Sequence, residues 1–186
     1  MDCVDAGVTI ATVETPPVRG PNGASVVLQV SSSDDYSKDS HLCMADYKLV
    51  FTPANGAPVT VDFLAADDDY GRKLSLRLDG FSQDGKRVLG IISESTKTPY
   101  TFLVDYHTAD GSVQLVDLAK LFARALNAGC EPAFGVIGTT ASGAIVLELD
   151  SPKACASNGR WLVDPAGGNP RRLPQAASFL NLYNGE

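Results

Sequence analysis

Short segments of strand-like sequence recur along the whole chain. Residues 74–78 read Leu-Ser-Leu-Arg-Leu, the alternation of apolar and polar positions that is typical of a strand with one buried face. Residues 87–92 and 144–149 are instead rich in Val, Ile and Leu, which indicates strands buried on both faces. Alternating and continuous apolar segments of this length are both typical of β-strands, and they predict an all-β protein.

Six two-residue turn signals separate these strands, and they come in three pairs. The pairs are Asn22-Gly23 with Asn55-Gly56, Asp84-Gly85 with Asp110-Gly111, and Ser142-Gly143 with Gly167-Gly168. A type I′ hairpin turn needs positive φ at both central residues, which favours Asn, Asp and Gly. The first members of the pairs lie 62 and 58 residues apart, and the second members 55 and 57. This period predicts three repeated units, each a four-stranded antiparallel sheet.

The chain is therefore expected to be a single repeat domain over residues 1–186. Its units cover about residues 4–66, 72–118 and 131–174, followed by a strand-like tail over 175–186. Pro170 lies in the last strand of the third unit, and proline cannot donate a ladder hydrogen bond, so that strand is expected at an outer edge. Because an open edge favours a partner, the tail is expected either to begin a fourth unit or to pair with an exposed edge.

Residues 117–128 carry a helical pattern between the second and third units. Asp117 is a suitable N-cap, Gly129 a suitable end, and five apolar residues share one face: Leu118, Leu121, Phe122, Ala125 and Leu126. The sequence predicts one short helix here, either a connector packed on the sheets or an interface helix.

Composition and charge then narrow the classes of partner. The chain has 15 Lys and Arg against 22 Asp and Glu, a formal charge of −7, so it lacks the basic surface that nucleic acids and anionic membranes require. Hydrophobic residues make up 44%, the balance of a folded globular protein. No run of 18 apolar residues occurs, so membrane insertion is not expected. The first residues lack the order of a signal peptide, and an exported form is expected to have lost its signal already.

Two segments are similar to a known family of repeats. Residues 81–89, Phe-Ser-Gln-Asp-Gly-Lys-Arg-Val-Leu, resemble the "FSPDGKRL" opening of TolB-like β-propeller repeats, with Gln83 where the family usually has Pro. Residues 161–173, from Trp161 to Leu173, resemble the end of such repeats, and in the third unit Ala141-Ser-Gly143 replaces the Asp-Gly turn. The resemblance implies WD-type four-stranded blades in an export-compartment protein that binds proteins or peptides.

Three blades are fewer than the four to eight that usually close a propeller. Three arrangements remain open: a fragment of a longer propeller, a six-bladed ring completed by a second copy, and three sheets packed in an open or sandwich arrangement. The fold class expected is therefore all-β, a partial or oligomer-completed β-propeller.

The four cysteines fit the repeat. Cys3 and Cys130 each precede the first strand of a unit, and Cys43 and Cys155 lie between the second and third strands. These positions share one end of an up-and-down sheet, which predicts disulfides joining Cys3 with Cys43 and Cys130 with Cys155. The alternative is four reduced, buried thiols. Disulfides favour a secreted or periplasmic location.

Candidate catalytic residues are few. Residues 80–84 approach the G-x-S-x-G elbow but fail at the last position, so Ser82 is interpreted as a turn residue. His41 and His107 are the only imidazole bases, and His107 lies beside a turn, where a solvated role is expected. No Gly-rich phosphate loop is present. The sequence predicts neither an enzyme nor a cofactor.

One acidic cluster is a candidate for cation binding. Asp67, Asp68 and Asp69 offer hard oxygen ligands of the kind that Ca²⁺ prefers. Their spacing departs from the calcium-loop motif, because Arg72 stands in the place of its glycine. The alternative is a solvated connection between the first two units.

These observations favour a non-catalytic, extracytoplasmic, propeller-like binding module. The expected partner is a protein or peptide, or a second copy that completes the ring. The alternative is the accessory propeller portion of a peptidase-type hydrolase whose catalytic domain is not in this chain.

Overall fold

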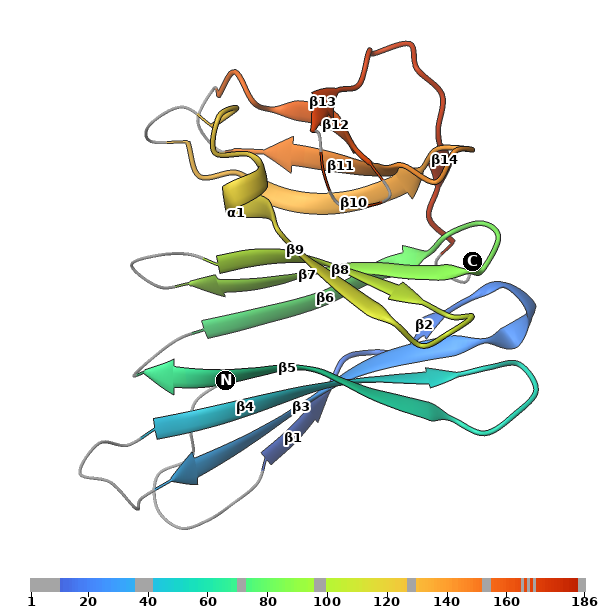
Figure 1. Cartoon of the computed structure of the whole chain (residues 1–186), viewed down its shortest axis with the longest axis vertical. Coiled ribbons are helices and arrows are strands. Elements are labelled where there is room, and N and C mark those ends of the chain that lie inside the picture. The colour runs from blue at the N-terminus through green and yellow to red at the C-terminus, as the bar shows by residue number, and fades with distance from the viewer. Residues whose placement is uncertain are drawn as a thin grey trace.

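The protein forms three antiparallel β-sheets that are stacked in chain order (Figure 1). The computed structural model describes residues 11–35, 42–69, 73–95, 100–126, 130–151, 155–164, 166, 168 and 170–183. The sheets do not close into a ring (Figure 1). The all-β prediction is confirmed, whereas the partial or oligomer-completed β-propeller stays a prediction.

Sheet 1 has five strands. They are β1 (Ala11–Glu14), β2 (Val18–Arg19), β3 (Ser25–Asp35), β4 (Leu42–Thr52) and β5 (Val59–Asp69). The order is β1-β3-β4-β5, and β2 pairs with β3 after a 3₁₀ turn, η1, over Pro21–Gly23. Strand β5 therefore lies at one edge of this sheet.

Sheet 2 is a four-stranded meander in the middle of the stack. Its strands are β6 (Lys73–Phe81), β7 (Arg87–Ser95), β8 (Tyr100–His107) and β9 (Val113–Asp117), in that order. Each neighbouring pair is antiparallel, as the turn signals predicted. Strand β9 forms the outer edge.

Sheet 3 contains the third unit and the chain's tail. Its strands are β10 (Ala133–Thr139), β11 (Ile145–Asp150), β12 (Gly159–Val163), β13 (Arg171–Arg172) and β14 (Leu180–Asn181). The order is β13-β12-β11-β10-β14. The strand after Pro170 is at an edge, as predicted, and the tail pairs with the open edge of β10 instead of beginning a fourth unit.

The hairpins form at the expected dipeptides, but the type I′ prediction was wrong at Asp84-Gly85, Asp110-Gly111 and Ser142-Gly143. At the second of these, the Gly111 N–H donates to the His107 carbonyl at 3.0 Å. The Gly85 N–H donates to the Ser82 carbonyl at 2.8 Å, and the Gly143 N–H donates to the Thr140 carbonyl at 2.9 Å. Gly85 and Gly143 are thus each the last residue of a four-residue turn, at φ 70° and 82°. A single left-handed glycine at this position reverses the chain with the twist that a hairpin needs.

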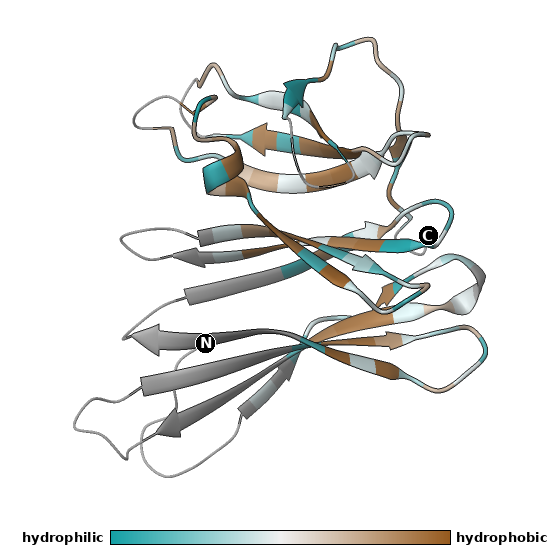
Figure 2. Ribbon diagram, in the orientation of Figure 1, coloured by the Kyte–Doolittle hydropathy of each residue, from teal (hydrophilic) through white to brown (hydrophobic). Residues whose placement is uncertain are grey.

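Two hydrophobic clusters hold the three sheets together, one on each face of sheet 2 (Figure 2). Val88 and Ile92 of β7 pack toward sheet 1, whereas Leu89 and Ile91 pack toward sheet 3. This confirms that β7 is buried on both faces. The central sheet therefore contributes apolar side chains to both interfaces of the stack.

The helix is shorter than the predicted range of 117–128. Helix α1 covers only Leu118–Leu121, and the Asp117 carboxylate caps it by accepting from the Lys120 N–H at 2.9 Å. Phe122 then turns into the core, where its ring lies 5.6 Å from that of Phe134. Because Leu118 and Phe122 are fully buried between sheets 2 and 3, this segment is a packed connector. No helix in the described part of the chain is long and apolar enough to cross a membrane.

Candidate functional site

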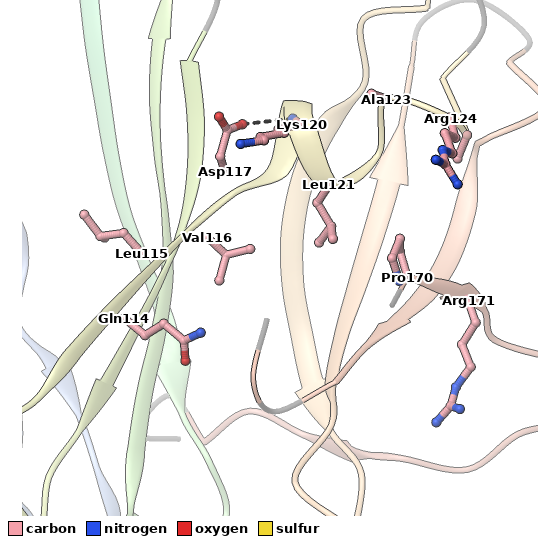
Figure 3. Close-up of a pocket in the computed structure, with 11 residues that line it drawn as sticks. Gln114, Leu115, Val116, Asp117, Lys120, Leu121, Ala123, Arg124, Pro170 and Arg171 are labelled. Atoms are coloured by element: carbon pink, nitrogen blue, oxygen red, sulfur yellow. Dashed lines mark hydrogen bonds between the residues drawn. The ribbon is translucent and has the colours of Figure 1, made fainter. Parts of the chain in front are cut away.

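A groove opens between the outer edges of sheets 2 and 3 (Figure 3). Its volume is about 1020 Å³, at the upper end of the range for ligand pockets. We call it the β9 groove; its lining residues are Gln114, Leu115, Val116, Asp117, Lys120, Leu121, Ala123, Arg124, Ala125, Pro170 and Arg171. Strand β9 and α1 supply one wall, and the segment entering β13 supplies the other.

The first wall is an edge strand with a free hydrogen-bonding side. Strand β9 pairs with β8 alone in the described sheet. The His107 N–H donates to the Ser112 carbonyl at 2.9 Å, so Ser112 directs its backbone groups toward β8. Because this direction alternates along a strand, Val113 and Leu115 direct their N–H and C=O groups away from the sheet.

The second wall begins at Pro170. The two arginines that follow have different surroundings. Arg172 donates to the Ala156 carbonyl at 2.9 Å, and its guanidinium lies 5.9 Å from the centre of the Trp161 ring. Arg171 lines the groove and forms a long ion pair with Asp164, at 3.9 Å. Arg172 therefore stabilises the third sheet through these contacts, while the Arg171 side chain is exposed to solvent.

Positive charge gathers in the β9 groove although the whole chain is acidic. Lys120, Arg124 and Arg171 are all exposed. Among the described residues, neither Lys120 nor Arg124 forms an ion pair. In the described lining, the one acidic residue is Asp117, and its carboxylate caps α1. The groove is thus a cationic region on a chain of charge −7.

A buried ion pair lies at the hairpin ends of sheets 2 and 3. Arg87 binds the Asp105 carboxylate through two nitrogens, Nε and Nη2, and donates through Nη1 to the Gly143 carbonyl at 2.6 Å. Asp105 is 1% exposed. His107 lies beside this pair, with its Nε2 3.5 Å from Asp105 Oδ2. The pair joins the two sheets. The hydroxyl of the nearby Ser82 donates to Asp84 at 2.7 Å and not to Asp105 or His107.

A second polar link joins sheets 2 and 3, and nothing in the sequence pattern indicated it. Arg77 Nη2 donates to the Phe134 carbonyl at 2.8 Å, and the Val136 N–H donates to Asp79 Oδ2 at 3.0 Å. Two side chains of β6 therefore satisfy the edge of β10 as a neighbouring strand would. Burial raises the pKa of Asp79, and the hydrogen bonds from Val136 and Arg77 act in the opposite direction.

The structure confirms one of the two predicted disulfides. Cys130 and Cys155 are bonded, with their Cα atoms 6.0 Å apart. They lie where the topology placed them, before the first strand of the sheet and between the second and third. Cys3 and the side chain of Cys43 lie outside the described residues, so their pairing stays a prediction.

The acidic cluster belongs to a strand and not to a connection between units. Asp67, Asp68 and Asp69 are the last residues of β5, paired with Met44, Cys43 and Leu42 of β4. Their side chains, like His41, lie outside the described residues, and calcium binding stays a prediction. In the described part of the chain, no group of three or more His, Cys, Asp or Glu residues is placed to hold a metal ion.

Comparison with known proteins finds no similar protein. No family model matches the chain, and neither a curated protein nor a solved structure matches it. The likeness to TolB-type repeats accordingly rests on the motifs at residues 81–89 and 161–173 alone.

Proposed function

We propose that this chain is a non-catalytic interaction module that binds a protein or peptide partner in its β9 groove. The observation that carries the proposal is the meeting of an open strand edge with an exposed cationic groove. The lining residues that the structure describes include no serine, cysteine or histidine, the usual nucleophiles and bases of hydrolytic enzymes. Polypeptides are the ligands that add to an open sheet edge.

We also propose that the module acts in an oxidising compartment, outside the cytoplasm, as a stack of WD-type or TolB-like blades. The disulfide between Cys130 and Cys155 supports this compartment, because cytosolic thiols are kept reduced. Consecutive antiparallel strands in sheet 2, and the stacking of the sheets in chain order, are the features that support blade-like units.

Selection from a displayed library of random peptides tests this function. The target is the folded chain, and the matched control is Ala123→Trp, which fills the groove at an exposed position of its lining. We expect enriched peptides that bind the wild-type chain and lose binding to the control. Enrichment of no peptide, or equal binding to both proteins, would contradict the proposed function.

A further inference from the structure

We infer that the partner segment is an extended, acidic stretch of another protein, which adds to β9 as a further strand of sheet 2. This inference rests on the proposed function, because it names the chemistry of the partner for the same groove. It follows from the direction of the β9 backbone groups and from the charge of the groove beside them.

The backbone of β9 selects an extended chain. Val113 and Leu115 direct their N–H and C=O groups away from β8, at an edge that no described strand occupies. A helix satisfies its own backbone groups and leaves such an edge unpaired. An added strand forms main-chain hydrogen bonds with it, and this part of the binding is independent of sequence.

The side chains beside β9 select acidic residues. Successive side chains of an added strand point to opposite faces, so every second one faces sheet 3. Pro170 and Arg171 lie on that side of the groove, with Arg124 beside them and Lys120 on α1 (Figure 3). Carboxylates at alternate positions of the added strand therefore face Arg124 and Arg171. Lys120, whose ammonium points toward Asp117, adds positive charge at the end of β9 (Figure 3).

The charge of the whole chain sharpens this choice. With a net charge of −7, the surface as a whole repels an acidic segment, and the β9 groove is a local exception. Three cations are too few for the electrostatic footprint of a nucleic acid. The groove is also lined by apolar side chains, including Leu121 and Ala125, which pack against the cluster between sheets 2 and 3. These groups suit the methylene and methyl groups of a peptide.

The probe for this inference is a fluorescein-labelled ten-residue peptide of alternating Glu and Thr. We expect its binding, followed by fluorescence anisotropy, to be saturable and to weaken with added salt. The triple variant Lys120→Gln, Arg124→Gln and Arg171→Gln should lower the affinity about tenfold or more, since each lost charge pair contributes modestly. Lys86→Gln removes an exposed cation from the hairpin between β6 and β7, away from the β9 groove, and should change the affinity by less than about twofold.

A second peptide separates strand addition from simple charge attraction. It has the same sequence with N-methyl groups on the threonines, which removes backbone donors and keeps every carboxylate. We expect it to bind about tenfold more weakly or worse, because main-chain bonds give strand addition its affinity. Since the three substituted cations are exposed, the triple variant should keep the wild-type melting temperature, and this is checked first.

Several outcomes overturn the inference. The first three are equal binding of the N-methylated peptide, unchanged binding to the triple variant, and stronger binding of a Lys-Thr peptide. Displacement of the peptide by oligothymidylate of equal charge would also overturn it. So would a dimeric mass in sedimentation that the Ala123→Trp substitution reduces to that of a monomer, because a second copy would then occupy the groove. Library peptides that depend on the groove but carry no acidic residues would overturn this inference and leave the proposed function standing. A library without any groove-dependent peptide would overturn both.

Discussion

At the scale of single residues, the junction between sheets 2 and 3 depends on charged side chains, most of which are buried while Arg77 stays exposed. Arg87 and Asp105 form a buried pair, and Arg77 and Asp79 bind the backbone of β10. Arg77 and Phe134 lie 57 residues apart in the sequence. No local pattern relates them, because their contact exists only once two sheets have stacked. Sequence reasoning could identify the strands here but not the polar links between them.

Removing one member of the buried pair should be costly. Arg87→Met leaves the Asp105 carboxylate without its counter-charge, and we expect the free energy of unfolding to fall by about 3–5 kcal/mol. The double variant Arg87→Met with Asp105→Leu should lose much less, because no charge stays buried alone. Urea denaturation of the three proteins measures the difference. A double variant as unstable as Arg87→Met would contradict this role.

Asp79 should give the protein an unusual dependence of stability on pH. Its folded pKa is raised above the ordinary value of 3.8, chiefly by burial, so the native state binds the proton more tightly than the unfolded state. Its contribution to stability is therefore complete below about pH 3.8 and is lost as pH rises through the raised value. As the pH rises from about 3.8 through the raised pKa, we expect Asp79→Asn to become more stable relative to wild type. Denaturation at several pH values measures this difference.

Asp84 provides the control of opposite sign. The Ser82 hydroxyl bond lowers the pKa of Asp84, so its contribution is present above pH 3.8 and is lost as pH falls through the lowered value. Relative to wild type, Asp84→Asn should therefore lose stability as pH rises toward 4. Parallel pH profiles for the two variants would contradict both assignments.

At the scale of elements, the strands and edges were predictable and the irregular segments were not. Alternation and turn dipeptides located the hairpins, and Pro170 identified the edge strand β13. The helix is only one turn long, shorter than predicted, because Phe122 packs in the core against Phe134 and Trp161. Tertiary packing overrode helical periodicity at that point. The β9 groove was also missed, since it forms between edges of two different sheets.

The tail strand β14 ties sheet 3 to sheet 2. Leu180 and Asn181 pair with β10, and Tyr183 exchanges two backbone hydrogen bonds with Phe81 of β6, at 2.7 and 2.8 Å. The tail approaches β10 so closely that a Cβ atom on Gly138 would lie 2.2 Å from the Leu180 carbonyl oxygen. A methyl group there must push the tail away.

Gly138→Ala should therefore loosen the tail. We expect a loss of about 1–3 kcal/mol, typical of an overpacked contact, and faster amide exchange at Tyr183. Gly168→Ala is the matched control, because a Cβ atom there meets nothing within 4 Å. Equal stability and exchange in the two variants would show that the tail does not depend on this close approach.

At the scale of the whole molecule, the stack is open but its described outer faces are not bare. The outer face of sheet 1 carries an ion pair between Lys48 and Asp62, at 3.3 Å. On sheet 3, the Phe179 ring of the tail lies 5.4 Å from the Arg160 guanidinium. Polar or covered faces are poor surfaces for further blades, so we expect the chain to sediment as a single copy of 19.6 kDa. Twice that mass would favour a six-bladed ring.

The disulfide should stabilise the molecule as a whole. The bond between Cys130 and Cys155 closes a loop with a sequence separation of 25 residues, which corresponds to a ceiling of about 3.5 kcal/mol in the chain-entropy model. Replacing both cysteines by serine should lower the free energy of unfolding by up to that amount in denaturant titrations. An unchanged value would contradict a structural role for the bond.

Amide hydrogen exchange resolved by residue shows whether the open edge of β9 is a binding surface. In the free chain, the N–H groups of Val113 and Leu115 should exchange quickly, because they point away from β8. A saturating concentration of the Glu-Thr peptide should slow the exchange of both N–H groups. In the triple variant, the same concentration should slow their exchange far less. Unchanged exchange at both residues when the peptide is bound would contradict the claim.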